Sequence, residues 1–161
     1  MQLLTSLPTV PWVFVVVGSK DVRASFDIED VDRAIAFLAN TRAVDRASTV
    51  RYTAVFEVAG LPAPQDLHAD GESDLVTLFM KSIHVACVER MLPPLDALVV
   101  HVTGPRKGYP GHGYFTVNMQ VDPFGGTGSA EALQRAVSFW HAQLAEVERW
   151  GDQYRRGQTS L

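Results

Sequence analysis

The hydrophobic and polar positions follow two different periods along the chain, and the period of each segment predicts its secondary structure. Residues 12–18 form an apolar run rich in β-branched side chains, and residues 22–26 alternate between apolar and polar side chains. Both patterns are typical of β-strands, and the short turn between them predicts a hairpin. The alternation returns at residues 50–59, which we therefore expect to form a third strand.

Three longer segments repeat their apolar residues at the spacing of an α-helix. They span residues 28–40 after the capping residue Asp27, residues 74–92, and a stretch from about residue 130, after the capping residue Ser129, to beyond residue 150. Pro93 and Pro94 end the second helix, because proline cannot continue the helical hydrogen bonds. This second helix is apolar on two sides, which favours a central position in the fold or one at a subunit interface.

Two further strands are expected on either side of a long loop at residues 104–113. They span residues 95–103 and 114–122 and complete the order ββαβαββα. About five mostly antiparallel strands and three amphipathic helices predict an α+β fold, in which the helices cover one face of a sheet and leave the other open. We expect the 161 residues to form one such two-layer sandwich domain.

The open face follows from the register of the last two strands. If the loop closes an ordinary hairpin, Thr103 lies opposite Tyr114, and the large apolar side chains gather on the covered face. The opposite face then carries His101, Thr116, Asn118 and Gln120. Such a face is either the hydrated side of an antiparallel sheet or a recognition surface whose polar groups satisfy those of a partner.

The loop at residues 104–113 is the most distinctive segment of the sequence. It contains four glycines, two prolines and the side chains of Arg106, Lys107 and His112. Glycine backbone amides can converge on an anion, and these side chains could neutralise a phosphate or carboxylate. The alternative is a flexible hairpin tip, because no phosphate-loop or dinucleotide-binding signature is matched, and we expect no cofactor. The candidate binding residues are His101, Arg106, Lys107, His112, Tyr114, Thr116, Asn118 and Gln120.

Two other histidines have potentially reactive neighbours. His84 and Cys87 stand three residues apart on the second helix, but Cys87 lies in the middle of the apolar stripe, which favours an inert core thiol. His68 lies beside two aspartates in an irregular stretch, a pattern that fits either a weak metal or acid/base site or a solvated loop. His141 is expected on the polar side of the last helix. We predict no metal site.

Composition and charge restrict the class of protein. Fourteen basic against eighteen acidic residues leave a net charge of −4, the wrong sign for binding nucleic acid through its phosphates. A chain of 161 residues can bury a core without metals or disulfides, and it has one cysteine. With no basic residue among the first ten and no apolar run of membrane-spanning length, we expect a cytoplasmic protein that does not enter a membrane.

Two functional hypotheses remain open at this point. In the first, the acidic domain is an interaction module that uses the open polar face to bind itself or a basic protein, as immunity proteins neutralise nuclease toxins; this is an analogy of size and charge. In the second, it is a small enzyme or an anion-binding protein, with His101 as acid/base and Arg106 or Lys107 as anion clamp. A pocket joining His101, Asn118 and Arg106 would favour the second hypothesis.

Overall fold

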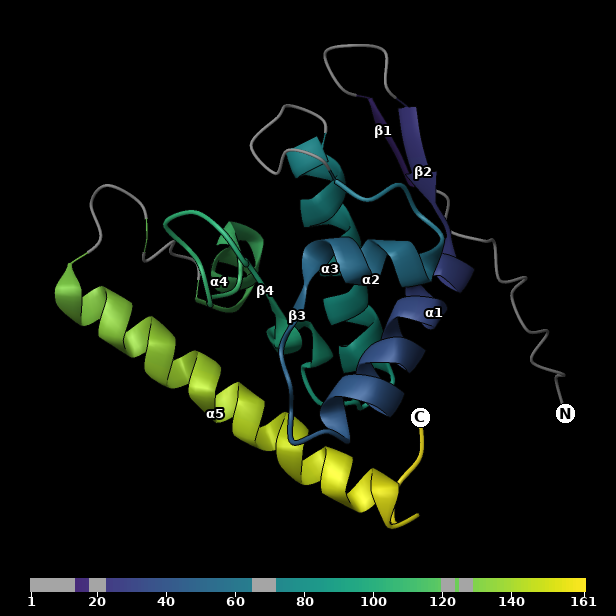
Figure 1. The fold of residues 1–161 in the computed structure, drawn as a ribbon, viewed down its shortest axis with the longest axis vertical. Coiled ribbons are helices and arrows are strands. Elements are labelled where there is room, and N and C mark those ends of the chain that lie inside the picture. Colours follow the sequence, from purple (N-terminus) through teal and green to yellow (C-terminus); the bar gives the residue numbers. More distant parts are fainter. Residues whose placement is uncertain (1–13, 18–22, 65–71, 120–123, 125–128) are drawn as a thin grey trace, which may run out of the picture.

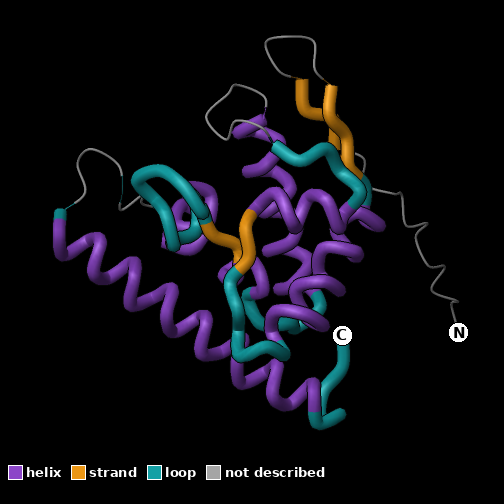
Figure 2. Tube along the Cα trace, in the orientation of Figure 1, coloured by secondary structure: helices purple, strands orange, loops and turns teal. Residues whose placement is uncertain are grey.

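The computed structural model describes residues 14–17, 23–64, 72–119, 124 and 129–161, and this part of the chain is mostly helical (Figure 1; Figure 2). The helices are α1 (Ile28–Phe37), α2 (Tyr52–Ala59), α3 (Glu72–Glu89), α4 (His112–Met119) and α5 (Ala130–Arg155). A π-helix, η1 (Leu38–Ala43), continues α1, and a short 3₁₀ helix, η2 (Leu95–Leu98), follows α3. The strands are β1 (Phe14–Val17), β2 (Arg23–Phe26), β3 (Val50–Arg51) and β4 (Val99–Val100).

This architecture shows that the expected five-stranded sandwich is wrong. The described strands form two separate two-stranded sheets, an antiparallel pair β1–β2 and a parallel pair β3–β4. Each strand of the parallel pair has only two residues, so the described chain contains no broad sheet face on which three helices could pack. The open polar sheet face predicted around His101 is therefore not formed by the residues that the structure describes.

The segments with the strongest local signals were predicted correctly. The N-terminal hairpin pairs Phe14 with Phe26. At the start of α1, the Asp27 side chain accepts hydrogen bonds from the backbone N–H groups of Glu29 and Asp30, and the Asp30 side chain in turn accepts from the Asp27 N–H. The helix α5 begins after Ser129, whose hydroxyl caps the N–H of Ala132.

The third predicted strand is instead the helix α2. Its buried residues are Tyr52, Val55, Phe56 and Ala59, which follow the i, i+3, i+4, i+7 spacing of one helical face. The same short segment also satisfies strict alternation, and periodicity alone does not separate the two possibilities over eight residues. Gly60 ends the helix in a left-handed conformation with φ of 81°, which glycine adopts at little cost.

The last two predicted strands are also largely helical. Residues 95–98 form η2 directly after the two prolines, and only Val99 and Val100 continue as a strand. The second segment folds as α4, in which the adjacent residues Tyr114 and Phe115 are both buried. On a strand these neighbours would point to opposite faces, so the register that paired Thr103 with Tyr114 is wrong.

The long helix α5 runs along the molecule and joins two hydrophobic clusters (Figure 1). Its N-terminal half packs Ala136 and Trp140 against the cluster that contains Phe115. The indole N–H of Trp140 donates a buried 2.8 Å hydrogen bond to the carbonyl oxygen of Ala97 in η2. Its C-terminal half places Val147 and Trp150 in the larger cluster built by α1, α2 and α3.

One apolar side of α3 packs into the core, as predicted, whereas the second apolar side is not covered in the described structure. The helix contacts α1, α4 and η2, and it buries Phe79, Ile83 and Cys87. Val85 and Val88 remain exposed on its other side. Among the helices of the described residues, none has the length and apolar content needed to span a membrane.

Candidate functional site

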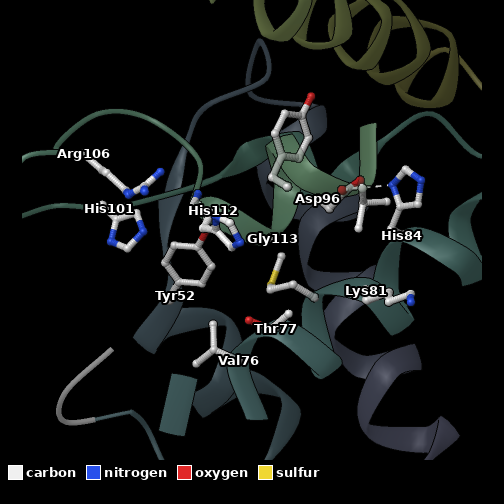
Figure 3. Close-up of a pocket in the computed structure, with 14 residues that line it drawn as sticks. Tyr52, Val76, Thr77, Lys81, His84, Asp96, His101, Arg106, His112 and Gly113 are labelled. Carbon is white, nitrogen blue, oxygen red and sulfur yellow. Dashed lines mark hydrogen bonds and ion pairs between the residues drawn. The ribbon is translucent and has the colours of Figure 1, made fainter. Parts of the chain in front are cut away.

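A cleft of about 240 Å³ lies between α3, α4, η2 and the loop that follows β4 (Figure 3). Fourteen residues from α2, α3, η2, α4 and this loop line it. They are Tyr52, Val76, Thr77, Met80, Lys81, His84, Asp96, His101, Arg106, Gly111, His112, Gly113, Tyr114 and Val117. The lining combines three imidazoles, two permanent cations, a carboxylate and two phenols with a few apolar side chains.

Asp96 and His84 form a pair at one side of the cleft. Pro93 and Pro94 turn the chain after α3, so that η2 runs back along that helix and places Asp96 beside His84. Oδ2 of Asp96 lies 3.1 Å from Nδ1 of His84. Asp96 is only 4% exposed, and within the described structure its other carboxylate oxygen is buried without a hydrogen-bond partner. The hydrogen bond to Asp96 raises the pKa of His84, although partial burial acts in the opposite direction.

Tyr52 and His101 form a second side of the cleft. Tyr52 opens α2, and its hydroxyl oxygen accepts a 2.7 Å hydrogen bond from the backbone N–H of Gly111. Its ring lies 5.0 Å, centroid to centroid, from the imidazole of His101. Gly111 has no room for a side chain, because a Cβ there would lie 2.7 Å from the Tyr52 hydroxyl and 3.0 Å from Nε2 of His101. Burial raises the pKa of Tyr52, so its hydroxyl stays protonated at neutral pH.

The loop between β4 and α4 supplies Arg106 and His112. The guanidinium of Arg106 lies 5.0 Å from the centre of the Phe124 ring, a cation–π arrangement that orients it. His112 is the first residue of α4, whose first turn contains no acidic residue. Figure 3 shows Arg106, His101, His112 and Tyr52 gathered on one side of the cleft, opposite His84, Asp96 and Lys81.

Tyr114 connects the cleft to the smaller hydrophobic cluster. It is buried, and among the described residues no group hydrogen-bonds to its hydroxyl. Burial raises the pKa of Tyr114, and the negative charge of Asp96 raises it further. The phenol is therefore neutral throughout the physiological pH range.

The charges of the lining favour an anionic ligand. Lys81 and Arg106 are permanent cations and His84 has a raised pKa, whereas Asp96 is the one carboxylate among the described lining residues. The His84–Asp96 pair can also take up or release a proton. In the described part of the chain, no group of three or more His, Cys, Asp or Glu side chains is arranged to hold a metal ion.

The structure brings together four of the eight candidate binding residues. His101, Arg106, His112 and Tyr114 line the cleft. Lys107 is exposed and forms a backbone β-bridge with His101.

Lys107, Thr116 and Asn118 are described but do not line the cleft. On α4, the Thr116 hydroxyl donates to the carbonyl oxygen of His112 and the Asn118 amide donates to that of Tyr114. Neither residue is part of the lining. Gln120 lies outside the described residues.

Sequence reasoning missed Tyr52, Lys81 and Asp96 and assigned His84 to core packing. The signal for Asp96 was present, because it is a lone carboxylate in the apolar run at residues 91–100. An ionised group in such a run is either paired or functional, since burying an unpaired charge is costly. Tyr52 was not recognised as a site residue, because its segment was assigned to a strand.

The sequence also singled out a cysteine and two further histidines. Cys87 is 1% exposed, and burial raises the pKa of its thiol to about 12, which confirms the core assignment. His141 is exposed on α5, as expected. His68 and its neighbouring aspartates lie outside the described residues.

The fold and the cleft together define a mostly helical protein with a small cleft, lined by charged, polar and apolar side chains, where its two hydrophobic clusters meet. No protein-family model, curated protein or solved structure matches the chain.

Proposed function

We propose that the protein binds a small anionic molecule in the cleft. The observation that carries this proposal is the charge of the lining, in which Lys81, Arg106 and His84 face a single carboxylate, Asp96. The chain as a whole has a net charge of −4, so this local excess of positive charge runs against the global balance. Cationic groups in a concave site attract and hold a carboxylate or phosphate group.

The volume of the cleft restricts the size of the ligand. Pockets that enclose drug-sized molecules have volumes of roughly 300–1,000 Å³. The cleft has about 240 Å³, which suits a small metabolite better than a dinucleotide. Its apolar residues, Val76, Met80 and Val117, are suited to contact a short carbon skeleton.

Several contacts hold the walls in place without a ligand. The Gly111 N–H binds the Tyr52 hydroxyl, Asp96 binds His84, and the Phe124 ring supports Arg106. When a ligand binds to a preformed site, less free energy is lost in ordering the side chains of the site. This preorganisation supports ligand binding.

The described structure does not support the surface on which the hypothesis of a protein-interaction module was based. It required a flat polar sheet face, and the described chain has only two-stranded sheets. The ligand hypothesis required a pocket that joins His101, Asn118 and Arg106, and the cleft contains two of these three residues. We therefore favour ligand binding, and we retain the cytoplasm as the proposed compartment because the one cysteine is buried and unpaired.

Titration with inorganic phosphate, followed by amide chemical shifts, tests the proposal. Phosphate is expected to shift the signals of Gly111 and Gly113 in the wild-type protein. Arg106→Gln should weaken the response by about tenfold, because it removes a charge-assisted hydrogen-bond donor. Lys107→Gln is the matched control, since Lys107 adjoins Arg106 in the chain and lies outside the cleft lining.

Thermal unfolding gives an independent readout of the same binding. Ligand at ten times its Kd should stabilise the fold by about 1.4 kcal/mol, or roughly 3–6 °C in Tm for a chain of this size. The proposal is wrong if phosphate and acetate leave the cleft signals unchanged, or if Arg106→Gln and Lys107→Gln reduce the response equally.

A further inference from the structure

We propose that the anion bound in the cleft also carries a neutral hydroxyl group, which donates a hydrogen bond to the carboxylate of Asp96. This inference rests on the proposed function and names the class of molecule that the cleft accepts. Its basis is the combination of a buried, incompletely bonded carboxylate with a set of cations on both sides of one cleft.

Asp96 has unused hydrogen-bonding capacity. An ionised carboxylate offers about four acceptor positions, and in the described structure a single side-chain contact, to Nδ1 of His84, uses one of them. The second oxygen is buried without a partner. A buried acceptor left unsatisfied is costly, so a donor supplied by a ligand would gain more here than at a solvated carboxylate.

The position of Asp96 allows a ligand to reach it. Asp96 lines the cleft and its side chain is 5% exposed, but Oδ1 itself is buried, so a donor reaches Oδ1 only when a part of the cleft wall moves. Met80 also lines the cleft and is half-buried, and a flexible thioether side chain adapts readily to a small displacement.

The charges around Asp96 favour a neutral donor over an ammonium group. His84 and Lys81 reach the cleft from α3 on the same side as Asp96 (Figure 3). The hydrogen bond to Asp96 raises the pKa of His84, so a positive charge next to Asp96 persists to higher pH than on an ordinary histidine. Tyr52 and Tyr114 add no charge, because burial raises the pKa of both phenols. An ammonium group on the ligand would be repelled by the positive charge of Lys81, whereas a neutral hydroxyl group would not.

The opposite side of the cleft receives the anionic group. Arg106 and His101 lie across the cleft from Asp96 in Figure 3. A molecule that spans the cleft therefore has an acidic group at one end and a hydroxyl at the other. Hydroxylated carboxylic acids and phosphate esters of short polyols share this chemistry.

Three probes of nearly equal size separate the alternatives. They are n-propyl phosphate, 2-hydroxyethyl phosphate and 2-aminoethyl phosphate, which differ in a terminal methyl, hydroxyl or ammonium group. Homologues with one or two additional methylene groups cover different separations of the two ends. Dissociation constants are measured by amide chemical shifts with the wild-type protein, so the ranking does not depend on whether any variant folds.

We expect the hydroxyl probe to bind about tenfold more tightly than the methyl probe, since hydrogen bonds to charged groups are among the stronger ones. The ammonium probe should bind no more tightly than the methyl probe. Asp96→Ala should remove the preference for the hydroxyl while retaining binding of inorganic phosphate. His84→Gln retains the carboxylate and should retain the preference.

The outcomes distinguish the two proposals. Equal binding of the hydroxyl and methyl probes at every length overturns the hydroxyl inference and leaves anion binding intact. Tightest binding of the ammonium probe overturns it in favour of a zwitterionic ligand. Failure of all probes and of inorganic phosphate overturns both proposals.

Discussion

Asp96 is the residue on which the chemistry of the cleft depends most. A carboxylate that is 4% exposed loses most of its hydration and needs a partner to remain charged. His84 supplies that partner from the neighbouring helix. The pair keeps a charge and a mobile proton next to the apolar interior, which is a common property of functional sites.

The His84–Asp96 pair should make stability depend on pH in a defined direction. Because the pKa of His84 is raised above its unfolded value of about 6.5, the folded chain binds this proton more tightly than the unfolded chain does. The stabilisation is complete below about pH 6.5 and is lost as the pH rises through the folded-state pKa. The free energy of unfolding of the wild type relative to His84→Gln should therefore fall over this window.

Denaturant unfolding at a series of pH values measures this difference. In a histidine NMR titration, Asp96→Asn should lower the pKa of His84, because the neutral amide no longer stabilises the imidazolium. Lys81, on the same face of α3, remains in both proteins and cancels from the comparison. An unchanged His84 pKa in Asp96→Asn would contradict the assigned cause.

Tyr52 and Gly111 should show strong energetic coupling. Tyr52→Phe removes the acceptor of the Gly111 N–H and should cost about 1–3 kcal/mol, because that N–H is buried. Gly111→Ala forces a Cβ to 2.7 Å from the Tyr52 hydroxyl and should cost about 1–3 kcal/mol. In the double variant the hydroxyl is absent, so the total loss should be smaller than the sum by at least about 0.5 kcal/mol.

Urea unfolding of the four proteins measures this coupling. Gly113→Ala is a suitable control, because its Cβ would meet the Thr77 side chain at ordinary distances of 3.5 and 3.9 Å. Additive losses in the double-mutant cycle would show that the Gly111 side of the cleft is not packed as described.

At the scale of elements, the contact between α5 and η1 depends on a glycine. A Cβ on Gly151 would lie 2.2 Å from the carbonyl oxygen of Ala43, so the two backbones meet with no space for a side chain. Polar contacts hold the same region, since the Tyr154 hydroxyl donates a 2.7 Å hydrogen bond to the Asn40 side chain. Glycine inside a helix is unfavourable in itself, and this close approach explains its presence.

Gly151→Ala should destabilise the protein even though alanine favours a helix by about 1 kcal/mol. The clash is with backbone atoms, which no side-chain rotation relieves, and the net loss should be about 1–3 kcal/mol. Thermal and urea unfolding measure it. The exposed α5 substitution Ser138→Ala should change stability by less than about 0.5 kcal/mol. A stabilised Gly151→Ala protein would refute the tight contact.

At the scale of the whole molecule, the cleft lies where the two hydrophobic clusters meet. Tyr52 belongs to the larger cluster and Tyr114 to the smaller one, and both line the cleft. The helix α5 links the clusters through Trp140 and Trp150. The geometry of the cleft therefore depends on the relative position of the two clusters.

Labelling of Cys87 should report on the opening of this assembly. The thiol is 1% exposed and burial raises its pKa to about 12, so the native protein should react slowly with a thiol reagent at neutral pH. Reaction should require opening of the core, and its rate should increase with urea in parallel with unfolding. Rapid labelling of the native protein would place Cys87 outside the core.

The amino-acid sequence by itself determined the elements whose signals are local and long. The capped helices α1 and α5, the long helix α3, the N-terminal hairpin and the buried Cys87 were all predicted. Their periodicity extends over several turns, or their caps involve neighbours in the chain, so no distant contact is needed to identify them.

The tertiary structure alone decided the short elements and the composition of the cleft. Residues 52–59 fit the period of a strand and that of a helix, and residues 112–119 were predicted as the end of a loop and the start of a strand; both segments form helices packed against the core. The cleft combines residues from five separate segments between Tyr52 and Val117. Their proximity results from packing, because periodicity records which face of an element is buried but not which other element covers it.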